Sequence, residues 1–335
     1  MTGVAGFRRP VILGGDGQLA GEFRVLLPDA TCLDRRQADL TRPDALRDAL
    51  AGLAPDLVLN CAAYNLVDQA EREPEAAFAA NALGPGALAR ACRALGATLV
   101  HVSTDMVFGL DAARSTPYSE RELPGPVNAY GASKLAGEHL VAAAGTDHLI
   151  VRTCGLYGRR GGPTRKTSFV DRILAKARAG ETLRVVGDQS CTPSAAADVA
   201  AGILELLAAG ARGTAHLTNA GQCSWHEFAA AIVALAGVAA RVEAIGSADW
   251  TGEARRARYT VLHAGVREGL GLPPMAHWHD ALALIRGDGM DWDYVVRRAR
   301  HGPRRVLSLL LYAQSNDLPV PRAAVEALWD QVRDC

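Results

Sequence analysis

The chain has 335 residues and no net charge, because 36 Lys and Arg balance 36 Asp and Glu, and 49% of its residues are hydrophobic. This length and composition allow one large or two modest domains with a substantial core. The neutral balance argues against a nucleic-acid partner, no apolar run approaches the length of a membrane span, and the N-terminal apolar stretch breaks at glycine too early for a signal peptide.

Strand-like and helix-like segments alternate along the chain, which is typical of parallel βαβ units. An apolar strand at 11–13 runs into a glycine-rich turn that opens a helix at 18–27. The same pattern predicts strands at 30–33, 56–60, 97–103 and 148–152 and helices at 43–51, 74–95 and 129–144. A smaller mixed lobe is suggested by the segments 168–179, 183–186, 195–209, 215–218 and 225–236.

The last fifty residues lack the alternation of strand-like and helix-like segments seen in the rest of the chain. Prolines and glycines punctuate this part and predict three helices at 292–301, 304–314 and 322–332. Their apolar stripes need a partner surface, so we expect either a helical cap or a homodimer contact. The arginines at 297–305 are interpreted as a solvated face rather than as a site for an anionic partner.

The seven cysteines are scattered, odd in number and free of Cys-x-x-Cys spacing. Such a pattern is typical of reduced thiols in a cytoplasmic protein and indicates neither a disulfide framework nor a zinc site. The nine histidines form no ligand cluster either, since His277 and His279 merely flank Trp278. We therefore expect a cytoplasmic protein without a metal centre.

The turn after the first strand carries Gly14 and Gly17 in a Gly-x-x-Gly-x-x-Ala pattern. Glycines there permit a tight turn and let the backbone approach a pyrophosphate, which the helix N-terminus then stabilises. A plain strand-to-helix connection would also be glycine-rich. Asp34, however, ends the next apolar stretch about 20 residues after Gly14, where a dinucleotide fold places an acid to accept ribose hydroxyls.

Tyr130 and Lys134 form the most informative pair of the chain, which holds only three lysines (Lys134, Lys166 and Lys176). Four residues apart on a helix, the phenol and the ammonium lie one turn from each other on the same face. The cation favours the phenolate and so moves the pKa of the phenol toward a value useful for proton transfer. An ordinary solvated helix face has the same spacing, but beside the glycine turn the pair predicts acid catalysis.

Seven motifs follow one another in a familiar order. They are Gly14-x-x-Gly17-Gln18-Leu19, Asp39-Leu40, the stretch 60–71, Val102-Ser-Thr104-Asp105, Tyr130-Gly-Ala-Ser-Lys134, Val151-Arg-Thr153 and Asp188-Gln189-x-x-x-Pro193. In this order they resemble the dTDP-4-dehydrorhamnose reductases, which belong to the extended short-chain dehydrogenase/reductases. The resemblance spans roughly residues 10–285 and does not cover the C-terminal helices.

The resemblance implies an α/β fold with a Rossmann-type doubly wound parallel sheet, a smaller substrate-binding lobe and, beyond it, a C-terminal helical appendage. We expect an NAD(P)-binding domain mainly within 8–165, a substrate lobe with returning sheet elements mainly within 166–286, and a helical extension of unknown role at 287–335. The residues expected around NADPH or NADH are Gly14, Gly17, Gln18, Leu19, Asp34, Arg35, Asp39, Leu40, Ala62, Ala63, Tyr64 and Asn65, together with Tyr130 and Lys134.

The activity implied by the resemblance is reduction of the 4-keto group of a nucleotide-linked 4-keto-6-deoxysugar, expected to be a dTDP sugar. Tyr130 would protonate the developing alkoxide, Thr104 would donate a hydrogen bond to the same oxygen, and Lys134 would contact the nicotinamide ribose. Thr104 could instead be a threonine that only satisfies backbone groups at a strand end. The residues expected at the sugar are Thr104, Asp105, Met106, Gly155 and Ser168.

Two other functions are compatible with the same motifs. Dehydratases of the superfamily carry an Asp-Glu pair after the threonine, whereas Asp105 is followed here by Met106, which favours net reduction over a dehydratase or epimerase. A non-catalytic subunit similar to the regulatory subunit of methionine adenosyltransferase would tolerate loss of the catalytic tyrosine, and Tyr130 is present. The C-terminal helices keep a partner-binding role open.

Three residues depart from the reductase pattern: Met106 replaces an aromatic residue, Gly155 a tryptophan and Ser168 an asparagine. Because they fall where the sugar should lie, we expect a larger, less polar pocket and a preferred substrate other than dTDP-4-dehydrorhamnose. The residues after the second strand do not favour one cofactor over the other. Asp34 disfavours the 2′-phosphate of NADPH, whereas Arg35 and Arg36 favour it. Dual use of NADH and NADPH is therefore expected.

Overall fold

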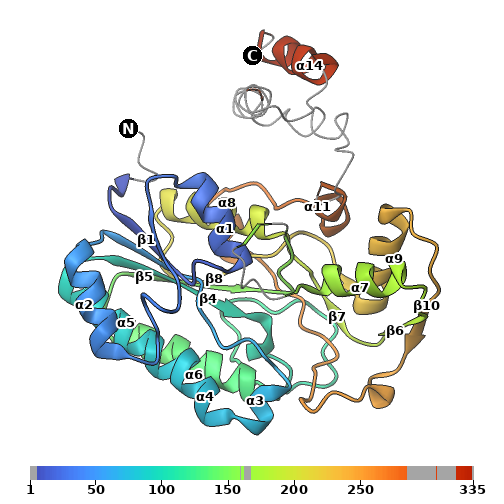
Figure 1. Cartoon of the computed structure of the whole chain (residues 1–335), viewed down its shortest axis with the longest axis horizontal. Helices are drawn as coiled ribbons and strands as arrows, with labels where there is room; N and C mark the ends of the chain where they lie inside the picture. Colours follow the sequence, from blue (N-terminus) through green and yellow to red (C-terminus); the bar gives the residue numbers. More distant parts are fainter. Residues whose placement is uncertain (1–5, 159, 162–166, 285–306, 308–321, 334–335) are drawn as a thin grey trace. The chain divides into compact units, whose positions relative to one another are not determined.

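The computed structural model describes residues 6–158, 160–161, 167–284, 307 and 322–333 (Figure 1). The chain divides into two compact units, Met1–Leu282 and Ala283–Cys335. In the second unit the described helix is α14 (Arg322–Arg333), close to the bounds predicted from the sequence, with Val325 and Leu328 buried and Trp329 exposed. The helix predicted at 292–301 and, apart from Leu307, the helix predicted at 304–314 lie outside the described residues.

A six-stranded parallel sheet forms the centre of the first unit (Figure 1). Its strands, in spatial order, are β2 (Thr31–Leu33), β1 (Pro10–Leu13), β3 (Leu57–Asn60), β4 (Thr98–Thr104), β5 (His148–Thr153) and β8 (Gly213–His216). The central strands are apolar runs because both faces of the sheet are covered. The chain leaves β1 toward β2 and then crosses back to β3, so β1 and β3 flank a topological switch point, where such sheets bind ligands.

Helices cover both faces of this sheet (Figure 1). One face carries α1 (Gln18–Leu26) and α8 (Ala196–Ala208), which bury side chains such as Phe23 and Ile203 in a common core. The other face carries α2 (Pro43–Leu53), α5 (Gly84–Leu95) and α6 (Ala129–Ala143) over a second core. The predicted doubly wound α/β fold is therefore confirmed.

The single helix predicted at 74–95 consists of three parts. After α3 (Gln69–Arg72), α4 (Pro74–Phe78) leads into a π-helical turn, η2 (Ala79–Leu83), which continues as α5. The turn is pressed against α6, since a Cβ on Gly137 would lie 2.0 Å from the carbonyl oxygen of Asn81. π-helical turns are often found at functional sites, and this one orients the fully buried side chain of Asn81.

The smaller lobe is a mixed structure beside the carboxyl end of the sheet. Here β6 (Leu183–Val186) pairs in parallel with β10 (Val242–Ile245), and β7 (Ser190–Cys191) pairs antiparallel with β9 (Cys223–Ser224). The helices α7 (Phe169–Arg178) and α9 (Trp225–Ala236) pack together through Phe169, Trp225 and Phe228. The remaining short helices are η3 (Asp105–Val107), η4 (Ser247–Asp249), α10 (Gly265–Gly269) and α11 (Trp278–Leu284).

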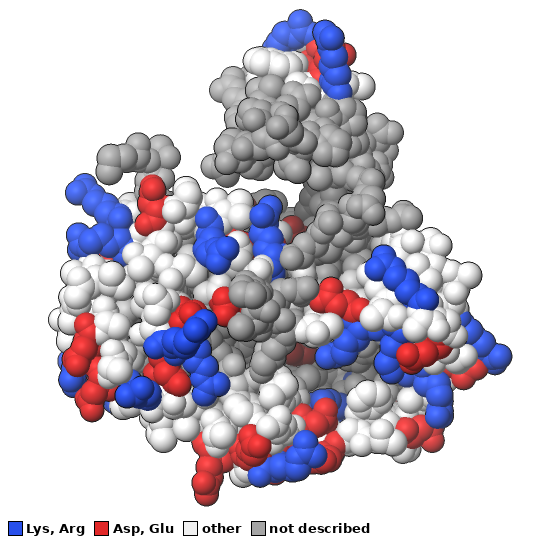
Figure 2. Space-filling view, in the orientation of Figure 1, with Lys and Arg blue, Asp and Glu red and all other residues white. Residues whose placement is uncertain are grey.

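The surface of the protein mixes charges of both signs. Figure 2 shows Lys and Arg interspersed with Asp and Glu over the visible face, in keeping with the zero net charge. Among the described residues no helix has both the length and the apolar character needed to cross a membrane. The described cysteines, Cys32, Cys61, Cys92, Cys154, Cys191 and Cys223, are free thiols.

Candidate active site

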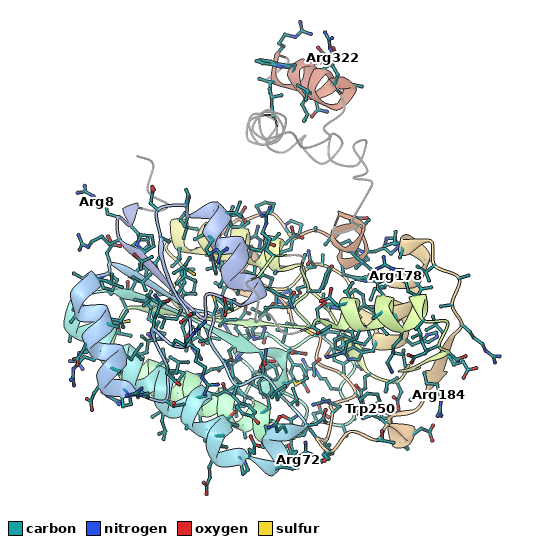
Figure 3. The ribbon with its side chains drawn as sticks, in the orientation of Figure 1. Arg8, Arg72, Arg178, Arg184, Trp250 and Arg322 are labelled. Atoms are coloured by element: carbon teal, nitrogen blue, oxygen red, sulfur yellow. The ribbon has the colours of Figure 1, made fainter. Side chains whose placement is uncertain are left out.

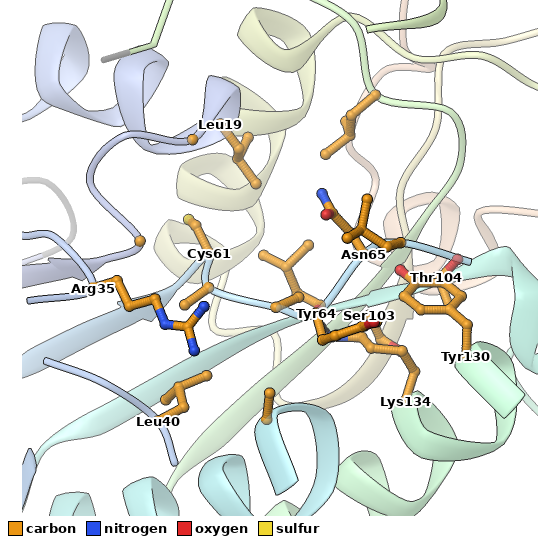
Figure 4. Close-up of a pocket in the computed structure, with 18 of the residues that line it drawn as sticks. Leu19, Arg35, Leu40, Cys61, Tyr64, Asn65, Ser103, Thr104, Tyr130 and Lys134 are labelled. Atoms are coloured by element: carbon orange, nitrogen blue, oxygen red, sulfur yellow. Dashed lines mark hydrogen bonds between the residues drawn. The ribbon is translucent and has the colours of Figure 1, made fainter. Parts of the chain in front are cut away.

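A cavity of about 730 Å³ opens at the switch point between β1 and β3 (Figure 4). Its lining brings together most of the residues singled out in the sequence, although they come from six separate segments. These are Gly14, Gly17, Gln18, Leu19, Arg35, Asp39, Leu40, Ala62, Ala63, Tyr64, Asn65, Thr104, Tyr130, Lys134 and Gly155. Asp34, Asp105, Met106 and Ser168 do not belong to this lining.

The glycine turn leaves the floor of the cavity bare of side chains. Gly14 has a φ of 79°, and a Cβ there would lie 2.8 Å from the backbone nitrogen of Ala62, so only glycine fits. The Gly17 N–H donates to the Gly14 carbonyl at 2.8 Å, which closes the turn. Gly17 is also the N-cap of α1 and offers no side chain to its first N–H groups, so these can receive an anionic group.

Asp34 is engaged in its own turn. Its Oδ1 accepts hydrogen bonds from the backbone N–H of Arg36 at 2.8 Å and of Gln37 at 3.0 Å. Arg35 instead extends along the cavity wall, and its Nε lies 3.3 Å from Asp39 Oδ2 (Figure 4). The structure thus brings the guanidinium of Arg35, but not the carboxylate of Asp34, to the cavity.

Tyr130 lies in the first turn of α6, which begins at the N-cap Asn128, whose side chain accepts from Gly131 N at 2.7 Å. Its phenol is hydrogen-bonded to Thr104 at the end of β4. Burial raises the pKa of Tyr130 to about 12, and the hydrogen bond to Thr104 only partly opposes this. The expectation that Lys134 lowers this pKa is therefore wrong for this structure, since its ammonium is bonded to a backbone carbonyl. A neutral phenol is nevertheless the form that a proton donor needs.

Lys134 is 2% exposed and reaches the cavity wall from α6. Its Nζ donates to the Val102 carbonyl at 2.7 Å, and no further hydrogen bond to Nζ is present among the described residues. Burial lowers the pKa of Lys134 to about 8, although the Glu138 carboxylate opposes that shift. An ammonium has three N–H donors, so two remain for a ligand in the cavity.

Asn81, which was not predicted from the sequence, connects two segments of the site through hydrogen bonds of its buried side chain. Its Oδ1 accepts from Tyr64 N at 2.8 Å, and its Nδ2 donates to the Tyr64 carbonyl and to Ser133 Oγ. Ser133 in turn donates to the carbonyl of Tyr130 at 2.8 Å. The side chain therefore ties the cavity loop after β3 to the helix that carries the acid. An asparagine within a run of alanines was the only signal in the sequence.

A second cavity of about 490 Å³ lies between the end of β4 and the smaller lobe, and Asp105 and Met106 line it. Burial raises the pKa of Asp105, while hydrogen bonds from Thr260, Cys154 and Thr104 oppose the shift. Cationic and aromatic side chains share its walls, and Figure 3 shows two of them, Arg184 and Trp250, on the lobe. The full set is Arg172, Lys176, Arg184, Arg256, Phe108, Phe169, Trp225 and Trp250.

The two remaining departures from the reductase pattern have structural explanations. Ser168 is the N-cap of α7, and its hydroxyl takes part in a capping box with Asp171. Ser168 lines neither cavity. Gly155 has a φ of 51°, and a Cβ there would lie 3.0 Å from Cη2 of Trp225. The indole of Trp225 therefore already covers this position. Gly155 in place of a tryptophan therefore does not leave this position without an aromatic neighbour.

Comparisons with known proteins agree with this geometry. The family model described as the RmlD substrate binding domain matches residues 8–287. A dTDP-4-dehydrorhamnose reductase of Mycolicibacterium smegmatis is 40% identical over 81% of this chain and 83% of its own length. A dTDP-4-keto-6-deoxy-D-glucose reductase of Streptomyces niveus is 36% identical over 84% of this chain and 94% of its own.

The fold is shared with a solved relative as well. The crystal structure of a dTDP-4-dehydrorhamnose reductase from Bacillus anthracis, in complex with NADP, superposes with a TM-score of 0.78 at 34% identity. The match covers 83% of this chain and 98% of that one. With a family model that spans the whole catalytic unit and relatives at this level of identity, the protein is a member of the RmlD family of NAD(P)H-dependent oxidoreductases.

Proposed function

We propose that the protein reduces the 4-keto group of a dTDP-linked 4-keto-6-deoxysugar and prefers NADPH as the reductant. One observation carries the proposal: the hydrogen-bonded side chains of Tyr130 and Thr104 lie where the two cavities adjoin. Thr104 lines the first cavity and Asp105, the next residue, lines the second. A hydride donor in the first cavity and a keto sugar in the second would therefore meet beside a proton donor.

The first cavity fits a dinucleotide cofactor. The bare glycine turn and the uncapped N-terminus of α1 suit a pyrophosphate, and the two unused N–H groups of Lys134 suit ribose hydroxyls. When bound, the cofactor supplies the hydride from its nicotinamide ring. The Bacillus anthracis relative was crystallised with NADP, which supports this assignment.

The preference for NADPH rests on two neighbouring side chains. Asp34 accepts two backbone N–H groups of its own turn, and it does not line the cavity. Arg35 lines the cavity and presents a planar guanidinium that matches a phosphate. We therefore favour the arginine over the acid in recognising the ribose, in place of the dual use expected from the sequence.

The chain's own residues account for the proton transfer. The hydroxyl of Tyr130, neutral because burial raises its pKa to about 12, gives its proton to the oxygen that was the carbonyl of the sugar. The hydroxyl of Thr104 donates to Asp105 Oδ1 at 3.1 Å, and with the sugar bound it would turn to donate to the same oxygen as negative charge develops there. Lys134, one helical turn away, keeps two N–H groups for the cofactor beside this acid.

The second cavity suits the nucleotide part of the substrate. Arg172, Lys176, Arg184 and Arg256 supply positive charge for a diphosphate, and the aromatic side chains of the wall suit a base. Arg256 is itself held at 3.0 Å by Asp68 Oδ2 and so needs no rearrangement to face the cavity. Relatives named as dTDP-sugar reductases support the thymidine nucleotide.

The test is a spectrophotometric assay of NADPH consumption with a panel of nucleotide-linked sugars. We expect turnover with dTDP-linked 4-keto-6-deoxysugars and none with the corresponding 4-hydroxy sugars, which have no carbonyl to reduce. Arg172→Met should raise KM for the sugar and leave the KM for NADPH unchanged. Tight NADPH binding without turnover of any 4-keto sugar would refute the proposal and favour a non-catalytic subunit.

A further inference from the structure

A buried ion pair lies beneath the site and belongs to neither cavity lining. Arg152 on β5 and Glu138 on α6 have side chains that are 6% and 4% exposed, and Nη2 of the arginine lies 2.6 Å from Oε2 of the glutamate. Nε of Arg152 contacts both carboxylate oxygens, and Nη1 lies 3.3 Å from His216 Nε2. Burying two charges is costly, and an apolar pair of similar volume is often as stable, so such a pair invites a functional explanation.

Glu138 connects the elements that carry the catalytic residues. Ser103 Oγ donates to its Oε1 at 2.5 Å, and Ser103 is followed directly by Thr104 at the end of β4. Arg152 lies opposite Ser103 in the parallel register of β4 and β5. The carboxylate therefore fixes the strand end that presents Thr104 against the helix that presents Tyr130.

Glu138 also faces Lys134, because the two lie one turn apart on the same helix. The other titratable groups around this ammonium are uncharged: burial raises the pKa of the Cys61 thiol, and burial together with Lys134 lowers that of His101 on β4. Tyr130 is a neutral phenol. Among the described residues, Glu138 is therefore the group that brings a full negative charge to Lys134.

We propose that Glu138 is a positioning residue of the active site: it ties the strand end that carries Thr104 to the helix that carries Tyr130, and its charge faces the Lys134 ammonium. Without that charge a lysine this deeply buried loses its proton more readily. Its consequence for catalysis rests on the proposed function, whereas its effect on Lys134 does not. Arg152 pairs with the carboxylate in the core, where an unpaired buried charge would be costly.

The direct test is the titration of Lys134 by NMR in the cofactor-free protein, with lysine labelled at its terminal carbon. The chain has three lysines, so three signals are expected, and the one missing from a Lys134→Met variant identifies Lys134. In the wild type it should titrate near pH 8. In Glu138→Gln the midpoint should fall by about one to two pH units, as expected for two charges about 6 Å apart at an effective dielectric constant of about 20.

Two further variants separate the effect of the Glu138 charge on Lys134 from the effect of the hydrogen bond between Glu138 and Ser103. Ser103→Ala breaks the contact with β4 but keeps the charge, so the midpoint of Lys134 should stay where it is while kcat falls and KM for NADPH holds. Glu205→Gln is the matched control, because it removes the carboxylate partner of another buried arginine, Arg267, away from the site. It should leave both the midpoint and kcat unchanged.

Glu138→Gln leaves Arg152 without its partner and could fail to fold, so Glu138→Gln with Arg152→Gln is measured in parallel. Either folded variant should show a downward shift, smaller in the double variant because it also removes the positive charge of Arg152, and the alkaline fall of kcat should move to lower pH in step with it. An unchanged Lys134 midpoint in a folded variant would overturn the proposal even if the reductase activity is confirmed. A shifted midpoint in a protein that reduces no sugar would uphold the proposal and remove the proposed function instead.

Discussion

Cofactor choice offers the sharpest mutational test, because Arg35 and Arg36 are adjacent but differently placed. Arg35 lines the cavity, whereas Arg36 does not and instead lies 3.7 Å from Asp34 Oδ2 through its Nε. We expect Arg35→Ala to weaken NADPH binding and to leave NADH binding nearly unchanged. Arg36→Ala removes an equal charge one residue away and should affect neither cofactor.

The size of the effect follows from the exposure of Arg35. A hydrogen-bonded pair with a charged group contributes about 1.5–3 kcal/mol when water is excluded. The side chain of Arg35 is 83% exposed, so water and salt screen the interaction and reduce the expected contribution to about 1–2 kcal/mol. This corresponds to a loss of roughly 5- to 30-fold in affinity for NADPH.

Titration of the wild type and of each variant with both cofactors, followed by fluorescence at low and high salt, measures the dissociation constants required. The NADPH penalty of Arg35→Ala should shrink as the salt concentration rises, because a phosphate contact at the surface is screened. Equal losses for NADPH and NADH would refute the reasoning, since only one of them carries the 2′-phosphate. Equal losses in the two arginine variants would show that general charge, and not a contact, is responsible.

Two further substitutions test the rest of the site. Tyr130→Phe should lower kcat by roughly 10²-fold or more while Kd for NADPH is unchanged, and near-normal turnover would contradict its assignment as proton donor. Gly14→Ala should lower Tm and weaken NADPH binding at least about tenfold, because it forces a side chain onto the Ala62 backbone at a positive φ that costs about 1–2 kcal/mol. Gly52→Ala on α2, where a Cβ meets nothing within 4 Å, is the control and should retain both properties.

The fold was predictable where local chemistry dictates it. Strands such as β3 are short apolar runs bounded by turns, and α2 begins at Pro43, a residue that favours the first turn of a helix. The π-helical turn at Ala79–Leu83 was not predictable from local sequence, and it lies where α6 approaches closely at Gly137. The two-residue strands β7 and β9 were missed for the same reason, since only their pairing defines them.

The site shows the same division between local and long-range causes. Gly14 and the Tyr130–Lys134 pair carry their chemistry within a few residues, so the sequence was enough to single them out. Asp34 was assigned to the cofactor from its spacing, but its carboxylate accepts from the N–H groups of Arg36 and Gln37 in the turn that follows it. Glu138 was missed because its partners, Ser103 and Arg152, come from two other strands.

The identity of the sugar depends on the wall of the second cavity, where Met106 replaces the aromatic residue of the reductase pattern. Its backbone is fixed, since Met106 N donates to Thr104 Oγ1 at 3.2 Å, so a new side chain would project into the same space. A thioether sulfur accepts only weak hydrogen bonds from a sugar hydroxyl, whereas a phenol both donates and accepts strong ones. We therefore predict that the wild type prefers a less polar keto sugar over dTDP-4-dehydrorhamnose.

Met106→Tyr should shift kcat/KM toward dTDP-4-dehydrorhamnose by about 2- to 12-fold, the equivalent of one hydrogen bond of about 0.5–1.5 kcal/mol. Met106→Phe adds the ring without the hydroxyl and should leave the ranking of substrates close to that of the wild type. Gly155→Trp is unsuitable for the same purpose, because its positive φ and the nearby Trp225 would strain the fold. If the wild type turns over dTDP-4-dehydrorhamnose best, or if Tyr and Phe at position 106 act alike, the wall of this cavity does not select the sugar through a hydroxyl contact.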